Sequence, residues 1–220
     1  IIYDIDAGFV PVATIRVPYL RNTRGIAASV ETGLLYLSYW GDRLGPDRRS
    51  SGDKLLAIDL ARSLPIWTRE IRPGIDSFAV TSDGTKIYMP AGEHGEHWRD
   101  WIVLDARTGE EQKRIEFASG PHNTVVSPDG SRAYLAAIGH DHLGVLDTRT
   151  DTVIAQVGPF GERLRPLALT GDGRFALVNV NFLSGFEVAD LVTGKVLHRV
   201  RAEGWPWVDP KLPQTQSHGV

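Results

Sequence analysis

The sequence contains no cysteine, and this absence excludes several kinds of chemistry at once. Without thiols the chain cannot form disulfide bonds, use a cysteine nucleophile or build a cysteine-ligated zinc site. The Gly-x-Ser-x-Gly elbow, the phosphate-binding loop and the Gly-x-Gly-x-x-Gly fingerprint are also missing. Acyl transfer and phosphoryl transfer therefore have no support from sequence motifs.

Long apolar runs and an excess of one charge are missing as well. The most apolar stretch, residues 175–182, is interrupted by Asn179 and Asn181, so we expect no membrane-spanning segment. The 24 Lys and Arg nearly balance the 27 Asp and Glu, for a formal net charge of -3. This balance gives no general attraction to nucleic acid, and we expect no nucleic-acid partner. Apolar residues make up 42% of the chain and charged residues 23%, which is typical of a globular protein.

The chain repeats itself, and two independent markers keep the same period. The first is a turn glycine, at positions 33, 84, 130 and 173. The second is an aspartate that closes an apolar segment, at positions 59, 105, 147 and 190. Both markers recur every 42 to 51 residues, which indicates one structural unit used several times.

Each unit predicts four short strands, which we call A, B, C and D. In the third unit they cover residues 124–127, 133–137, 143–147 and 153–157. Strands A and B are nearly continuous apolar runs, whereas strand D alternates apolar and charged residues as a half-exposed strand does. Asp-Gly between A and B, and Thr-Gly between C and D, supply the positive φ that tight turns need. No segment shows a sustained helical period.

Four-stranded units at this period predict an all-β fold, a β-propeller of four-stranded antiparallel blades. A single small sheet cannot bury both of its faces, but blades packed around an axis bury them against one another. A β-sandwich with regular turns is the alternative.

The repeat resembles the YVTN-type propellers, which are related to the quinoprotein-dehydrogenase-like and lactonase-like seven-bladed folds. The residues that carry the resemblance are 126–135, Val-Ser-Pro-Asp-Gly-Ser-Arg-Ala-Tyr-Leu, and 145–153, Val-Leu-Asp-Thr-Arg-Thr-Asp-Thr-Val. The likeness covers nearly the whole chain and implies the fold rather than an activity. Seven such blades need roughly 300 residues or more, so we expect this chain to be part of a longer propeller or an open arc.

We expect a single partial propeller over residues 1–220, with four whole blades and two partial ones. Their approximate limits are 1–18 (partial), 24–72, 75–118, 121–158, 165–202 and 217–220 (the start of the next blade). An open arc would leave blade faces uncovered and would favour oligomers.

We expect a periplasmic or secreted location, and the chain start is read as incomplete, so a missing signal peptide proves nothing.

Binding is expected on one face of the propeller. The A–B and C–D turns are tight and share one face, whereas the B–C and D–A connections share the other and include long loops at 39–53, 91–100 and 204–216. Variable loops on a rigid scaffold are the usual place for binding.

The first residues of successive A strands should surround one mouth of the central channel. These residues include Arg24, Asp76, His122, Asn123, Arg165 and His218. Such a ring could bind a small polar or anionic ligand, or could hold a metal ion through its imidazoles. Alternatively, its members pair with one another and with channel water.

Four histidines form a second candidate site. His94 and His97 lie in one B–C loop, and His140 and His142 lie in the same loop of the next blade. With their flanking carboxylates they could bind copper, zinc or iron. The alternative is a set of solvated surface histidines.

Two functions follow from these patterns. The first is a non-catalytic binding or scaffold module that holds a small polar or anionic ligand, or a protein partner, at its long-loop face and channel mouth. The second is a propeller enzyme, a lactonase-like hydrolase or a metal-dependent oxidoreductase. In that enzyme His122 or His218 would be the base, and Arg24 or Arg165 the electrophile. The fold itself does not choose between them.

Overall fold

A computed structural model describes residues 1–17, 20–41, 52–92 and 97–202, and in these residues every regular element is a β-strand. A two-stranded hairpin, β1 (Ile2–Asp4) and β2 (Val10–Ala13), comes first. Four four-stranded antiparallel sheets follow. Within the described ranges no helix is long and apolar enough to cross a membrane.

The four sheets use consecutive strands, as blades do. The first contains β3 (Arg21–Ser29), β4 (Leu34–Trp40), β5 (Asp53–Asp59) and β6 (Leu64–Ile71). The second contains β7 (Ala79–Val80), β8 (Lys86–Ala91), β9 (Asp100–Asp105) and β10 (Glu111–Glu116). The third contains β11 (Pro121–Val126), β12 (Arg132–Ala137), β13 (Leu143–Asp147) and β14 (Thr152–Val157). The fourth contains β15 (Leu164–Leu169), β16 (Phe175–Val180), β17 (Gly185–Asp190) and β18 (Lys195–Arg201).

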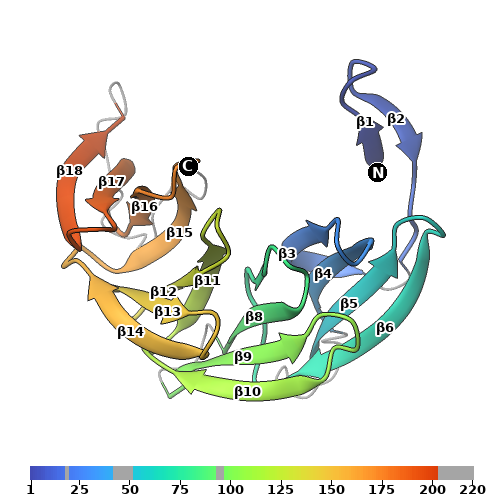
Figure 1. Ribbon diagram of the computed structural model, residues 1–220, viewed down its shortest axis with the longest axis horizontal. Coiled ribbons are helices and arrows are strands. Elements are labelled where there is room, and N and C mark those ends of the chain that lie inside the picture. The colour runs from blue at the N-terminus through green and yellow to red at the C-terminus, as the bar shows by residue number, and fades with distance from the viewer. Residues whose placement is uncertain (18–19, 42–51, 93–96, 203–220) are drawn as a thin grey trace.

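The sheets follow one another along an arc, with the first strand of each on the inside and the fourth on the outside (Figure 1). The predicted all-β fold of four-stranded propeller blades is therefore confirmed. The final predicted segment, 217–220, lies outside the described residues.

The apolar core lies between neighbouring blades. One cluster joins the first and second blades, another the second and third, and another the third and fourth. Strands β8 and β12 are buried along nearly their whole length, whereas β10 and β14 are mostly exposed. The apolar runs and the alternating runs in the sequence are thus explained by distance from the channel axis.

The first repeat marker, the turn glycine, occupies a position that needs a left-handed backbone conformation. Gly84, Gly130 and Gly173 have φ of 65°, 73° and 67°, and each donates its N–H to the residue three positions earlier. In the first blade the turn differs slightly, because Gly33 donates to Ser29 four positions back. The residue whose carbonyl accepts this bond, rather than the glycine, therefore gives the register between blades. These acceptor residues, at or directly after the end of strand A, are Ser29, Thr81, Ser127 and Thr170.

The aspartate in each A–B turn also has a structural role. Asp83 Oδ1 accepts hydrogen bonds from Thr81 Oγ1 at 2.6 Å and from the Thr85 amide at 3.0 Å. These bonds, the Thr81 hydroxyl first, hold the pKa of Asp83 below its ordinary value. Asp129 makes the same kind of bonds, with Ser127 foremost, and its pKa falls to about 2.

The second repeat marker caps the C–D turn. Asp105, Asp147 and Asp190 each accept backbone N–H groups within the turn that follows. Later in the same C–D turn, one residue of each blade has a positive φ. In blade order these residues are Ser63, Gly109, Asp151 and Gly194. The periodic aspartates therefore fix turns and are not a catalytic set.

The C–D turn of the third blade is bound to the second blade. Asp151 accepts the Tyr88 hydroxyl at 2.6 Å and the Lys86 ammonium at 2.8 Å. Lys86 also donates to the Thr148 carbonyl at 2.8 Å. Burial, followed by the bond to Asp151, raises the pKa of Tyr88, so the phenol remains a donor.

Candidate functional site

Four predicted site residues occupy one repeated position at the start of the innermost strands. Arg24, Asp76, His122 and Arg165 each stand five residues before the residue whose carbonyl accepts the turn hydrogen bond at the end of strand A. Repeated blades place such residues at the same end of the channel. The inner strands are joined directly here, because Ser77 and Asn123 form a parallel bridge and the Thr124 amide donates to the Ser77 carbonyl at 3.1 Å.

Three of the four come together around one buried carboxylate. Asp76 Oδ2 lies 3.2 Å from Arg24 Nη2 and 3.8 Å from His122 Nε2. The side chains of Asp76 and His122 are only 3% and 5% exposed, and Arg24 is 27% exposed. The Ser77 amide donates to Asp76 Oδ1 at 2.8 Å and so fixes the carboxylate. Charges removed from water this far require such partners.

Arg165 stands one blade further on and is also buried, at 6% exposure. Its Nε donates to Asn181 Oδ1 at 2.8 Å. Next to it, Asn123 Oδ1 accepts the Leu167 amide at 3.4 Å, which links the third and fourth blades. The predicted members of this mouth in the described residues thus include two permanently charged guanidiniums, one carboxylate and one imidazole.

Asn181 is a site residue that the sequence prediction missed. It follows β16 and lies in the most apolar stretch of the chain, residues 175–182, where an amide is costly unless it is bonded. An asparagine within this apolar stretch was therefore the sequence signal that a buried hydrogen-bond partner was needed there. Asn179 in the same strand is completely buried.

The histidine site is assembled in part. His140 and His142 lie together in the β12–β13 connection with Asp141 between them, and their ligand atoms all lie within 4.8 Å. Asp141 Oδ1 is 2.7 Å from His142 Nδ1, and this bond is the first cause that lowers the pKa of Asp141. His97 is exposed and is not a member of this group.

Some predicted positions fall outside the described residues. These are His94 in the second candidate site, His218 in the ring, and most of the loops at 39–53 and 204–216. The importance of the long-loop face therefore remains a prediction.

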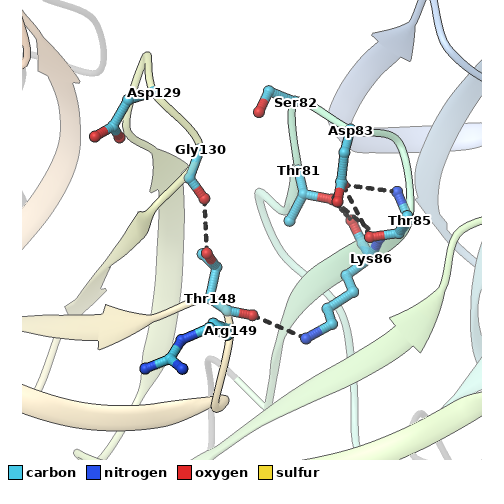
Figure 2. A pocket seen from close by; sticks show the side chains of 9 residues that line it. All are labelled: Thr81, Ser82, Asp83, Thr85, Lys86, Asp129, Gly130, Thr148 and Arg149. Atoms are coloured by element: carbon cyan, nitrogen blue, oxygen red, sulfur yellow. Dashed lines mark hydrogen bonds between the residues drawn. The ribbon is translucent and has the colours of Figure 1, made fainter.

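A cavity of about 380 Å³ lies on the opposite face, between the turns of the second and third blades (Figure 2). It is lined by Thr81, Ser82, Asp83, Thr85, Lys86, Asp129, Gly130, Thr148 and Arg149. Figure 2 shows that its polar groups bond to one another, since Gly130 accepts from Thr148 and Lys86 donates to Thr148. These bonds belong to the turns and to the contact between blades, so the cavity has the character of a structural groove.

Comparison with solved structures supports the fold. Kuenenia stuttgartiensis hydrazine synthase is similar with a TM-score of 0.64 and 20% identity, over 87% of this chain and 52% of that one. A protein of unknown function from Desulfotomaculum acetoxidans DSM 771 has a TM-score of 0.64 and 15% identity, over 81% and 55%. The dihydro-heme d1 dehydrogenase NirN, in complex with DHE, has a TM-score of 0.68 and 18% identity, over 89% and 40%.

These similarities, together with the sheet topology, define the chain as a β-propeller protein. The chain spans about half the length of these structures, at 52%, 55% and 40%. Their identities are low enough that they carry the fold and no activity. No family model matches the chain. No curated protein matches it either.

Proposed function

We propose that this propeller is a binding module whose channel mouth holds a small anionic ligand. The observation that carries the proposal is the position shared by Arg24, Asp76, His122 and Arg165 at the start of four successive inner strands. A guanidinium presents planar pairs of N–H donors that match carboxylate or phosphate oxygens.

The repeat itself argues that these residues are more than packing. A position that packs the blades stays apolar or aromatic, as the equivalent residues Tyr36, Tyr88, Tyr134 and Leu177 do on the second strands. The ring position instead changes between cation, carboxylate and imidazole from blade to blade. Burying such groups has a large desolvation cost, which favours a role in recognition over one in stability.

One observation favours the enzyme alternative. His122 lies 3.8 Å from the Asp76 carboxylate, and a carboxylate beside an imidazole orients it and stabilises its protonated form. This pair could act as a general base in a lactonase-like hydrolase. Turnover that disappears in His122→Ala would favour this alternative, and binding without turnover favours the binding module.

The proposal is tested by isothermal titration calorimetry with citrate, oxalate and inorganic phosphate. We expect the wild type to bind one of them at one site per chain. Arg165→Gln should weaken that binding by roughly tenfold to a hundredfold, since it removes a charge-assisted hydrogen bond.

Arg149→Gln is the matched control, because Arg149 is exposed and lies on the opposite face. Its affinity should equal that of the wild type. The proposal fails if no anion binds, if Arg165→Gln binds as tightly as the wild type, or if both variants lose the same affinity.

A further inference from the structure

The loop between β12 and β13 presents three adjacent side chains, His140, Asp141 and His142, on a backbone that is fixed on both sides. Its position between strands B and C places it at the same end of the propeller as the channel mouth. Four backbone hydrogen bonds hold it: Gly139 to Ser119 at 3.0 Å, His140 to Ala137 at 3.2 Å, Leu164 to His140 at 3.1 Å and Phe160 to Asp141 at 2.8 Å. Two of these come from the segment leading to the fourth blade, so the loop is clamped between blades.

The two imidazole rings are also held in place. His140 stacks on Phe117 with ring centres 5.6 Å apart and an interplanar angle of 12°. His142 meets His140 edge-on at 5.4 Å and 85°. Since rotation of either ring would break these contacts, both rings are preorganised and their nitrogens keep a fixed separation.

The ligand atoms have the separation that a metal ion needs. Asp141 Oδ1 lies 3.2 Å from His140 Nδ1 and 2.7 Å from His142 Nδ1. Ligands that bind zinc tetrahedrally at about 2.0–2.1 Å are about 3.3 Å from one another. Asp141 Oδ1 therefore lies near this separation from both imidazole nitrogens, and all three ligand atoms lie within 4.8 Å of one another.

Protons occupy this arrangement now. One is shared between Asp141 and His142, and the His142 amide donates to His140 Nδ1 at 3.0 Å. A metal ion would replace the shared proton and would take the His140 lone pair that now accepts this amide. The side chains are 32%, 52% and 30% exposed, which leaves the remaining coordination positions open to water.

We propose that His140, Asp141 and His142 bind one divalent transition-metal ion, with Zn²⁺ as the probe, through two imidazole nitrogens and one carboxylate oxygen. This site is separate from the anion-binding channel mouth and does not depend on it. Imidazole and carboxylate are ordinary ligands of zinc, and three protein ligands with an open position are typical of accessible zinc sites.

The test is calorimetric titration of the tag-free protein with Zn²⁺. We expect one ion per chain. His142→Ala should weaken binding by more than about 100-fold, because it removes a direct ligand and leaves the stacking of His140 on Phe117 in place. Asp141→Asn should also weaken binding, by at least about tenfold. His198→Ala is the control, because His198 is exposed on β18 and is not part of the proposed site. The His198→Ala protein should bind Zn²⁺ as tightly as the wild type does.

Circular dichroism verifies that each variant is folded. If His142→Ala does not fold, the Asp141→Asn protein serves as the test. The proposal is overturned if the wild type binds no stoichiometric Zn²⁺. It is also overturned if a folded His142→Ala or Asp141→Asn protein keeps full affinity, or if His198→Ala loses as much affinity as they do.

Discussion

Replacing Asp151 by alanine is expected to lower the free energy of unfolding by about 4 kcal/mol. Asp151 is the common acceptor for the Tyr88 hydroxyl at 2.6 Å and the Lys86 ammonium at 2.8 Å, and both donors come from the neighbouring blade. Its removal leaves a largely buried phenol and a partly buried cation without their carboxylate. Alanine also adds strain, since φ at this position is 53°, which aspartate tolerates better.

Two variants separate these contributions in urea unfolding followed by circular dichroism. Asp151→Asn keeps a residue suited to the left-handed conformation and removes only the charge, so we expect about half of the loss. Ser63→Ala changes the equivalent, exposed position of the first blade and should alter stability by less than about 0.5 kcal/mol. Equal effects of Asp151→Ala and Ser63→Ala would contradict the proposed link between blades.

Replacing Asp76 by alanine should have the second largest effect, a loss of about 3 kcal/mol in the free energy of unfolding. Its side chain is 3% exposed and faces both Arg24 and His122, so the substitution leaves cationic or polar groups close together at the channel mouth. The Ser77 amide loses its acceptor as well. Asp76→Asn keeps the size and some of the hydrogen bonds, and should be less harmful than alanine.

A double-mutant cycle shows whether the loss comes from the ion pair. In an Arg24→Met background, Asp76→Ala should be milder by about 1–3 kcal/mol, because the cation that it would leave behind is gone. The measurement is again urea unfolding. Additive losses from the two substitutions would show that Arg24 and Asp76 do not interact, which contradicts the geometry of the mouth.

The fold was predictable because its repeat markers are physically required. Gly84 and Gly130 occur where the backbone needs a positive φ, and Asp105 and Asp147 occur where a turn needs a side-chain acceptor. Such demands depend on neighbours in sequence, so the sequence shows them directly. The strand pattern was readable for the same reason, since exposure changes regularly from the channel to the rim.

The site was predictable only as far as the register of the repeat reaches. That register placed Asp76 and His122 together, and the structure brings them within 3.8 Å. It could not reveal Asn181 as the partner of Arg165, because that contact joins different strands and depends on side-chain reach. It also grouped His97 with the other loop histidines, whereas among the described residues the cluster contains only His140, Asp141 and His142.

In the proposed function, successive blades gather charged side chains on one rim of the channel, where they bind an anion. A crystal structure of the protein with the best-binding anion tests it most directly. We expect the anion at the start of the inner strands, about 3 Å from the Arg165 guanidinium and in contact with Arg24 or His122. An anion found only in the groove around Lys86 on the opposite face, or Arg165 and His122 at opposite ends of the channel, would contradict it.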